Sequence, residues 1–285
     1  MPDTKNEFLS SLFGNVAAGP CGLRYWLLPG CGTEAADLNM LLSFDFDRPM
    51  PDSITAIFKG SLSKRTRVVR FQSGGVSYIA KIFRPYHIRN LIRDHITHKR
   101  YIFSELKNNV LAASRGISTP RLYAYFEQTF LGLVRQTGIV MEDLKDHTLL
   151  RDLLNCGKRT IFDTLPVLEK LFRKGIYHID LNTKNILLRE SDNHWTLIDW
   201  QYCSFHPQLN DLQLLFMAAT MLRSAKIDPA DPQWLTWNKA LYAQCCLKVS
   251  FDKMLKAVQI MQSRKPSKSP RMSLDISQLG LDGVW

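Results

Sequence analysis

Hydrophobic and polar positions alternate in short runs near the start of the chain and follow a helical period further on. The runs at residues 53–59, 67–71 and 76–83 have the composition of strands, and short polar turns separate them. Sequential strands joined by short turns predict an antiparallel meander. The stretch before them contains Gly and Pro and shows no clear period, so residues 1–50 are expected to be an N-terminal extension of uncertain structure.

Helical spacing dominates the rest of the chain. Apolar residues at positions 88, 91, 92 and 96 share one helix face, and a second helix is predicted over residues 101–114, with Gly116 as its C-terminal cap. A buried strand is predicted at residues 138–141. The remaining segments are a hairpin at 186–188 and 196–198 and helices at 149–154, 161–172, 212–222, 234–247 and 251–261.

This order, strands first and then mostly helices, predicts an α+β fold with a small antiparallel-sheet lobe followed by a larger helical lobe. The sheet lobe is expected at residues 51–141, including one glutamate-bearing helix, and the helical lobe at 142–262. Residues 263–271 carry four basic residues, two prolines and no acid. Residues 263–285 are therefore expected to be a basic flexible tail.

Composition and charge narrow the classes of protein. A chain with 45% hydrophobic and 11% aromatic residues is not disordered throughout. No long apolar run and no signal-like N-terminus is visible, so a cytoplasmic location is expected. The six cysteines are scattered without a Cys-x-x-Cys pair, so neither a zinc site nor a disulfide framework is expected.

The basic charge has two interpretations. An excess of 37 Lys and Arg over 26 Asp and Glu gives a net charge of +11, which indicates either a polyanionic partner or a basic surface without a specific partner. Five of the basic residues fall within residues 84–100 beside a single acid. This segment either lies against an anionic membrane surface, or binds substrate phosphates, or is the solvated face of a helix whose apolar stripe packs on the small lobe.

The polar residues at positions 178–185, followed by those at 198–200, carry the clearest chemistry. Phosphoryl transfer needs a carboxylate that accepts the proton of the attacking hydroxyl, and Asp180 is the candidate. It also needs oxygen ligands for Mg²⁺, for which Asn185 and Asp199 are the candidates. Two carboxylates alone would also be typical of a glycosidase, but the intervening Asn and the strand–loop–strand spacing favour phosphoryl transfer.

A lysine and a glutamate upstream complete this set. Lys81, on the third predicted strand, has the context of a kinase lysine that binds the α- and β-phosphates of ATP. Glu105, on the following helix, is the candidate carboxylate that orients it. Taken alone, each residue has a simpler interpretation, as a solvent-facing strand lysine and an exposed helix acid. The four roles in the correct order favour the catalytic interpretation.

At these residues the sequence resembles the lipopolysaccharide kinase family, the Kdo and core-heptose kinases of Gram-negative bacteria. The resemblance rests on His-Ile-Asp-Leu-Asn-Thr-Lys-Asn-Ile-Leu-Leu at 178–188, Leu-Ile-Asp-Trp at 197–200 and Gly-Ile-Ser-Thr-Pro at 116–120. It spans about residues 57–222. It implies a two-lobed protein-kinase-like fold, ATP and Mg²⁺ as cofactors, and phosphotransfer to a sugar hydroxyl, of Kdo or heptose, in the lipopolysaccharide inner core.

The resemblance also implies where ATP binds. The segment at residues 141–144 lies where the family has its interlobe hinge, so the backbone of Glu142 and Leu144 is expected to bind adenine. The loop at residues 60–66 has one glycine where protein kinases have three. Its backbone N–H groups, with Gly60, Ser61 and Ser63, are the candidates for holding phosphate.

The departures from protein kinases concern the acceptor. Ile179 stands where a protein kinase has an arginine that pairs with a phosphorylated activation loop, and Trp200-Gln201 replaces Phe-Gly after the metal aspartate. Only eleven residues separate Asp199 from Asp211, and no Ala-Pro-Glu follows. A peptide substrate is therefore not expected.

The expected enzyme is an ATP-dependent carbohydrate kinase, a phosphotransferase with an alcohol group as acceptor. Its expected partners are the lipopolysaccharide core or a lipid A-linked sugar and an anionic membrane surface, at the inner face of the inner membrane, whereas nucleic acid is not expected. Two alternatives stay open: a small-molecule kinase of the aminoglycoside or choline type, and a non-catalytic kinase-like scaffold.

Overall fold

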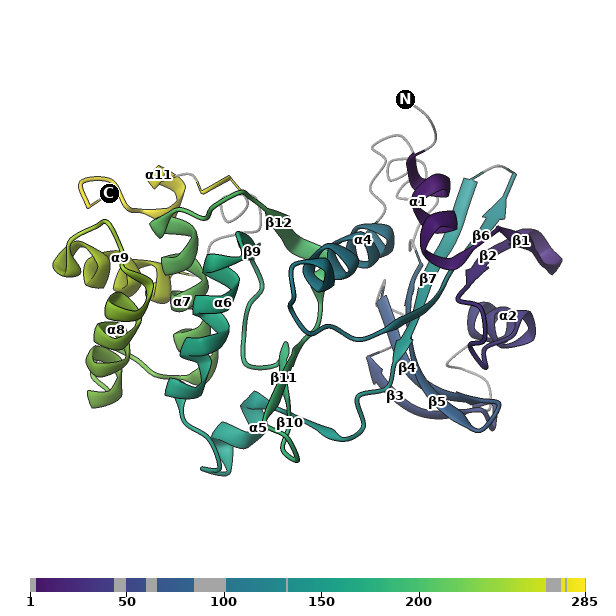
Figure 1. Cartoon of the computed structure of the whole chain (residues 1–285), viewed down its shortest axis with the longest axis horizontal. Coiled ribbons are helices and arrows are strands. Elements are labelled where there is room, and N and C mark those ends of the chain that lie inside the picture. The colour runs from purple at the N-terminus through teal and green to yellow at the C-terminus, as the bar shows by residue number, and fades with distance from the viewer. Residues whose placement is uncertain are drawn as a thin grey trace. The chain divides into compact units, whose positions relative to one another are not determined.

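The computed structural model of the chain describes residues 4–43, 50–59, 66–84, 101–131, 133–264, 273–274 and 276–284. Contacts divide the chain into two compact units (Figure 1). The sheet unit comprises Met1–Leu106 and Pro120–Leu144, and the helical unit comprises Lys107–Thr119 and Lys145–Trp285. Helix α4 (Tyr101–Ser114) contributes residues to both.

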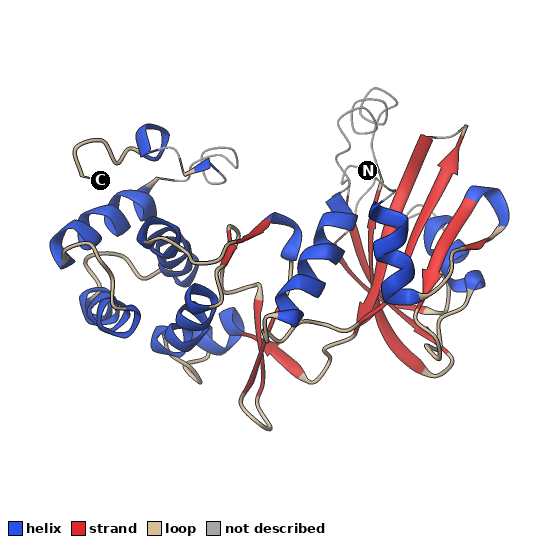
Figure 2. Cartoon of the chain, turned by 45° about the horizontal axis from the view of Figure 1, so that its top comes forward, coloured by secondary structure: helices blue, strands red, loops and turns tan. Residues whose placement is uncertain are grey.

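A seven-stranded antiparallel sheet forms the sheet unit, in the order β1-β2-β6-β7-β5-β4-β3 among the described residues (Figure 2). The predicted meander is confirmed as β3-β4-β5, and the buried strand predicted at residues 138–141 lies within β7. The strands are β1 Ala17–Ala18, β2 Leu23–Leu27, β3 Ile54–Lys59, β4 Thr66–Ser73, β5 Val76–Phe83, β6 Leu122–Phe130 and β7 Leu133–Glu142.

Helices cover both faces of this sheet. Helix α2 (Ala35–Ser43) buries three leucines against alternate residues of the strands, among them Phe71, Ala80 and Phe126. On the opposite face, Phe8 of α1 (Thr4–Phe13) packs edge-on against Phe103 of α4. Because side chains alternate along a strand, odd- and even-numbered residues of β5 face different helices.

The described part of residues 1–50, for which the sequence predicts no definite structure, contains helices and strands. Helices α1 and α2, the short helix η1 (Pro20–Gly22) and strands β1 and β2 all precede residue 50. Strand β2 pairs with β6 over five residue pairs. Strand β2 is short, and its pairing partner lies about a hundred residues later in the chain. Its pattern of hydrophobic and polar residues is therefore too brief to predict a strand.

The helical unit contains the elements predicted for it. The hairpin is confirmed, with Ile186 opposite Leu197. Helix α6 starts with Pro166 in its first turn and ends before Gly175, whose positive φ of 66° suits a chain reversal. The elements are β8 His147–Leu149, α5 Leu150–Asn155, η2 Ile161–Thr164, α6 Leu165–Arg173, β9 Ile176–His178, β10 Ile186–Arg189, β11 His194–Leu197, η3 Trp200–Tyr202, β12 Cys203–Phe205, α7 Asp211–Ala225, α8 Pro232–Cys245, α9 Phe251–Ser263 and α11 Ile276–Leu279.

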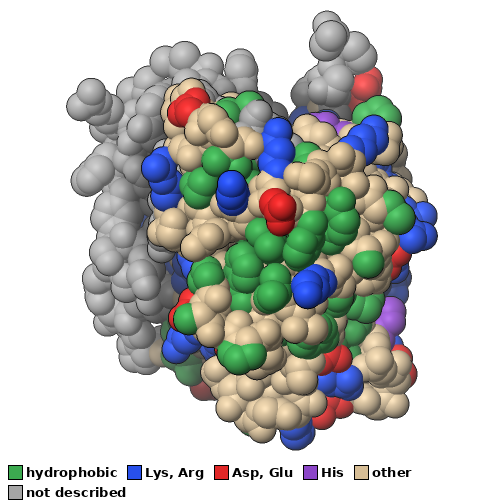
Figure 3. Space-filling view, turned by 90° about the vertical axis from the view of Figure 1, so that its left-hand side faces the viewer, with side chains coloured by type: hydrophobic (Ala, Val, Ile, Leu, Met, Phe, Trp, Pro, Cys, Tyr) green, Lys and Arg blue, Asp and Glu red, His purple; other side chains and the backbone are tan. Residues whose placement is uncertain are grey.

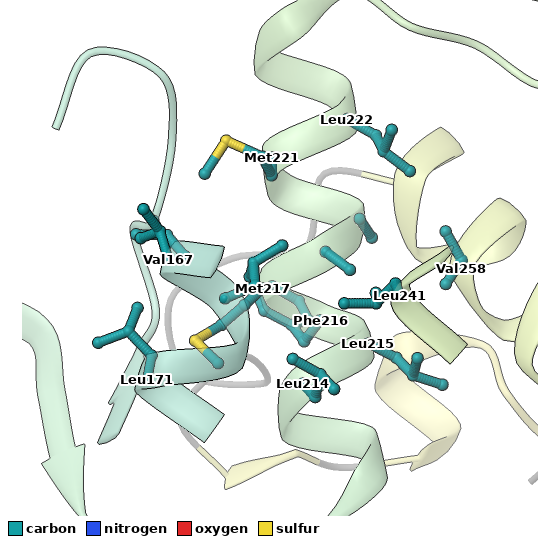
Figure 4. Close-up of a cluster of buried hydrophobic side chains, with 14 of the residues drawn as sticks. Val167, Leu171, Leu214, Leu215, Phe216, Met217, Met221, Leu222, Leu241 and Val258 are labelled. Atoms are coloured by element: carbon teal, nitrogen blue, oxygen red, sulfur yellow. The ribbon is translucent and has the colours of Figure 1, made fainter. Parts of the chain in front are cut away.

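Helix α7 is the centre of this unit. Asn210 caps its N-terminus by accepting from the Gln213 backbone N–H, and the Gln213 side chain accepts from the Asn210 N–H in return. The ten residues from 212 to 222 other than Thr220 are buried, which is the pattern of a helix surrounded by others. Figure 4 shows Val167 of α6, Leu241 of α8 and Val258 of α9 around it.

The C-terminal end of the chain joins this core. Leu279 and Leu281 are 1% and 0% exposed, so the prediction of a flexible tail is wrong for residues 276–284. Residues 265–272, which hold most of the basic cluster, lie outside the described residues.

Figure 3 shows one end of the helical unit, where hydrophobic side chains gather and Lys and Arg lie scattered around them. Within the described parts of the chain, no helix is long and apolar enough to cross a bilayer.

Candidate active site

A buried ion pair connects the sheet to α4. Lys81 lies in the second half of β5, opposite Val68 of β4 and Ile139 of β7. Its neighbours Ala80 and Ile82 face α2, so Lys81 points to the other face. Lys81 Nζ lies 2.6 Å from Glu105 Oε2, and the two side chains are 12% and 6% exposed. The two residues that the sequence analysis paired are thus in direct contact inside the sheet unit.

The candidate phosphate-binding residues Gly60, Ser61 and Ser63 lie outside the described residues. The candidate adenine-binding residues are described. Glu142 ends β7, and its backbone N–H donates to the Arg121 carbonyl (2.8 Å), while its carboxylate accepts from the Arg121 N–H (3.0 Å). This N–H is therefore already used within the sheet. Leu144 follows in the loop and is half-buried.

Asp143, between these two residues, fixes the end of β7. Its carboxylate accepts from Arg70 Nη2 (3.0 Å) and from Ser77 Oγ (2.7 Å), and Arg70 Nε lies 2.8 Å from it. A two-point Arg–carboxylate contact of this kind fixes orientation as well as distance. Sequence alone does not predict this pair, because Arg70 and Asp143 are 73 residues apart in the chain.

In the helical unit, the loop between β9 and β10 is organised around the backbone of Asp180. The Asp180 carbonyl accepts from Asn182 Nδ2 (2.7 Å) and from Asn185 Nδ2 (2.9 Å). Asn182 Oδ1 in turn accepts from the Lys184 N–H (2.9 Å). Two asparagine side chains therefore hold the peptide that carries the candidate base, whose own side chain is half-exposed.

Asp199 is held beside this loop by the strand that precedes it. The Ile198 N–H donates to the Asn185 carbonyl (3.0 Å), which brings the two candidate metal ligands onto neighbouring backbone. Asp199 itself has a left-handed conformation, with φ 64° and ψ 54°. Such a conformation is uncommon for a residue other than glycine and clusters at functional sites. Trp200, in place of the protein-kinase Phe, is buried in the helical core.

The buried side chain of His178 lies next to the segments that carry Asp180 and Asp199. Its side chain is fully buried, stacks at a tilt on Trp200 with ring centroids 5.1 Å apart, and places Nε2 3.3 Å from the Ile198 carbonyl. Burial lowers the pKa of His178, and the Asp199 and Asp180 carboxylates only partly oppose this effect. A neutral ring that donates from Nε2 fits these surroundings.

The donor atoms fit the cofactor that the sequence analysis predicted. Because Asn185 Nδ2 is bound to the Asp180 carbonyl, Oδ1 of the same amide is turned the other way. Asn185 Oδ1 and the Asp199 carboxylate are both oxygen donors, the type of ligand that suits Mg²⁺. Among the described residues, no group of three or more His, Cys, Asp or Glu side chains is arranged to hold a metal.

Asp180 also lines an open cavity of about 610 Å³ that lies wholly within the helical unit. Its walls come from the start of α5, the loop that follows β9 and the end of α7. They include Asn182 and Thr183, whose side chains donate hydrogen bonds to backbone carbonyls, and four basic side chains. These are Arg151, Lys184, Arg223 and Lys226.

The two units define a protein-kinase-like fold. The structure is similar to that of WaaP in complex with acyl carrier protein, with a TM-score of 0.50 and 14% sequence identity over 80% of this chain and 90% of that one. The chain is also 29% identical over 133 residues to the serine/threonine-protein kinase PknA of Nostoc sp. (strain PCC 7120 / SAG 25.82 / UTEX 2576). This match covers 43% of the chain and 22% of PknA.

The sequence of the chain identifies a family within this fold. The sequence model of the lipopolysaccharide kinase (Kdo/WaaP) family matches residues 58–213, which is more than half of the chain. The chain therefore belongs to this family. The predictions of the family and of a two-lobed kinase-like fold with an antiparallel-sheet lobe are confirmed. All the candidate site residues fall within the matched range, whereas Arg223 and Lys226 of the basic cavity lie beyond it.

Proposed function

We propose that this chain transfers the γ-phosphoryl group of ATP to a sugar hydroxyl, of Kdo or heptose, in the inner core of lipopolysaccharide. The observation that carries the proposal is the loop around Asp180, in which two asparagine side chains hold the backbone of a half-exposed aspartate at the edge of a basic cavity. Membership of the lipopolysaccharide kinase family supports the choice of acceptor.

Each candidate residue has a role in this reaction. Asp180 accepts the proton of the sugar hydroxyl as the hydroxyl oxygen attacks the γ-phosphorus and the bond to ADP breaks. Lys81 binds the α- and β-phosphates, and Glu105 holds the Lys81 ammonium group in place. Asn185 and Asp199 would hold Mg²⁺, which neutralises charge on the phosphates when it is bound.

The hydrogen bonds at the end of β7 support a narrower proposal for which backbone groups bind adenine. Since the Glu142 N–H is bound to the Arg121 carbonyl, adenine would use the Glu142 carbonyl and the backbone of Leu144. We assign the phosphates to the backbone of residues 60–66, with Gly60, Ser61 and Ser63. We assign one apolar wall of the adenine site to Ile79, which lies two residues before Lys81 on the same face of β5.

The test is a radiolabel-transfer assay with purified protein, ATP and three acceptors: deep-rough lipopolysaccharide, a soluble amino sugar and no acceptor. Arms with and without acyl carrier protein are included, because the similar WaaP structure is a complex with that protein. We expect label on lipopolysaccharide, and Asp180→Asn should lower the rate about 10²- to 10⁴-fold. Asp192→Asn, which changes an exposed aspartate of the β10–β11 turn, is the control.

Each alternative function has its own outcome in this assay. Label on the amino sugar instead of lipopolysaccharide would identify a small-molecule kinase. No transfer to any acceptor, with ATP still bound, would indicate a non-catalytic scaffold.

We further propose that the protein acts at the inner face of the inner membrane, held there peripherally by its basic charge. The net charge of +11 supports this, as does the clustering of basic residues in two short segments. Each Lys or Arg near an anionic leaflet contributes about 1 kcal/mol. The eight residues that we assign to the contact are Arg89, Arg93, Lys99, Arg100, Arg264, Lys265, Lys268 and Arg271.

A further inference from the structure

The cavity beside Asp180 is strongly basic. Four of its lining residues are cations, and Asp180 is the one carboxylate among the lining residues. The cations come from three separate places: Arg151 from α5, Lys184 from the loop after β9, and Arg223 and Lys226 from the end of α7 and its cap. The cavity has the size of a small-molecule site and an open mouth.

Two of these cations have no carboxylate partner among the described residues. Lys184 and Lys226 are exposed, and neither ammonium group lies within 4 Å of an acid in the parts of the chain that the structure describes. Arg151 contacts Asp152 through one nitrogen, Nε (2.8 Å), and Asp152 is itself exposed. Arg223 is held by the backbone carbonyls of Met261, Gln262 and Arg264.

Helix stability explains only part of this arrangement. Arg223 and Lys226 lie at the C-terminal end of α7, where a positive charge is favoured. Lys184 is on no helix, and Arg151 lies at the second position of α5, where a positive charge is not favoured. Lys226 also has a left-handed conformation with φ 61°, where glycine or asparagine is the usual residue.

The walls of the cavity are connected to one another. The Thr183 N–H donates to Ser224 Oγ (3.0 Å), which joins the Asp180 loop to the end of α7. The Arg151 N–H donates to the Thr183 carbonyl (3.0 Å), which joins the same loop to the start of α5. The backbone segments that carry the cations and Asp180 are therefore joined before a ligand arrives, and this lowers the part of the ordering cost of binding that comes from the backbone.

We propose that this cavity is the acceptor site and that its basic residues bind an anionic group, a phosphate or a carboxylate, carried by the acceptor next to the hydroxyl that Asp180 deprotonates. This inference rests on the proposed function for the identity of the reaction. It adds that the acceptor must be anionic. Lys184 and Lys226 are the main contacts, and they offset the repulsion between such an acceptor and Asp180.

The kinetic test uses Lys184→Gln, Lys226→Asn and the double variant. Asparagine tolerates the left-handed conformation, so Lys226→Asn removes the charge without new backbone strain. The matched control is Lys239→Gln with Lys256→Gln, which removes two exposed lysines of α8 and α9 outside the cavity. We expect KM for deep-rough lipopolysaccharide to rise about tenfold per lysine, with kcat and KM for ATP unchanged.

Modified acceptors separate the two anions. Phosphatase-treated and carboxyl-reduced lipopolysaccharide are compared with the intact acceptor. If the subsite binds the anion that a treatment removes, that treatment should weaken binding to the wild type but should not weaken binding to the double variant any further. The treatment with this effect identifies the anion as a phosphate or a carboxylate. If wild type and double variant show equal KM for the intact acceptor, or if the control changes KM as much, the subsite is rejected.

A binding measurement keeps this inference distinct from the proposed function. Glucosamine 6-phosphate, glucuronic acid and neutral glucosamine are titrated into the protein without ATP, and binding is followed by NMR. Anionic sugars that bind the wild type at least tenfold more tightly than the double variant support the subsite even if no phosphotransfer to lipopolysaccharide occurs. Equal binding of all three sugars overturns it.

Discussion

Replacing either member of the Lys81–Glu105 pair should destabilise the sheet unit as well as stop phosphotransfer. The charges are 2.6 Å apart on side chains that are 12% and 6% exposed. At an effective dielectric constant of about 20, two unit charges at this distance attract by about 6 kcal/mol, before the cost of desolvation. Removing one partner of a buried pair costs about 3–5 kcal/mol, because the other charge stays buried.

The partial exposure of Lys81 favours the lower end of that range. Glu105→Gln and Lys81→Met should therefore each lower the free energy of unfolding by about 3 kcal/mol. The double variant Lys81→Met/Glu105→Leu leaves no buried charge, so it should cost less than the two single changes added together. Its stability should lie close to that of the wild type, although its phosphotransfer activity should be as low as in Lys81→Met.

Urea unfolding followed by circular dichroism measures these free energies, and hydrogen exchange in β5 and α4 shows whether the change lies in the sheet unit. The double-mutant cycle gives the coupling energy between the two side chains. Single variants that unfold like the wild type, with a coupling energy near zero, would refute the reasoning, because the pair would then not be a buried ion pair in solution. The control is Arg173→Met, which removes the exposed partner of Glu169 on α6.

Three further predictions follow from the site and the charge. The free energy of unfolding should fall as the pH drops through about 6.5, because His178 of the unfolded chain takes up a proton there and the buried ring does so only at lower pH. The slope of this free energy against pH is at most about 1.4 kcal/mol per pH unit, and a His178→Asn variant with the same slope as the wild type would contradict the prediction. Phosphatase treatment of the purified protein should leave its initial rate unchanged, because Ile179 offers no cation to a phosphorylated loop, and a large loss of rate would reveal such regulation. Sedimentation of the protein with anionic liposomes should be strong at low salt and should weaken as added salt shortens the Debye length from about 30 Å towards 3 Å. A variant with the eight basic residues neutralised should not sediment, and equal sedimentation of this variant and the wild type at low salt would reject the membrane contact.

Much of the fold could be predicted because local period and burial agree. The strands from residue 53 to residue 83 alternate, and α4 has the bounds that the helical pattern predicts. Strand β6 was missed because Ala124, Tyr125, Phe126 and Glu127 are all buried, so its sequence does not alternate between apolar and polar residues. Leu281 joins the core through tertiary packing alone, which no local signal near the C-terminus indicates.

The candidate site was partly predictable for a related reason. Asp180 and Asn185 stand in one short motif, and its order along the chain relative to Lys81, Glu105 and Asp199 made them candidates. The basic cavity beside Asp180 depends on Lys184 and Lys226, which lie on different elements and meet only because the Asp180 loop is bonded to the end of α7. The sequence shows the excess of basic residues and two basic segments along the chain, but not that basic side chains gather around this cavity.

The central claim is that Asp180 activates a sugar hydroxyl of lipopolysaccharide for attack on ATP. The measurement that tests it most directly is a single-turnover reaction of enzyme, ATP and deep-rough lipopolysaccharide, with the inner core then analysed by mass spectrometry. We expect one added phosphoryl group on a Kdo or heptose residue with the wild type, and a rate about 10²- to 10⁴-fold lower with folded Asp180→Asn. An unmodified core with the wild type, or equal rates for the two proteins, would contradict it.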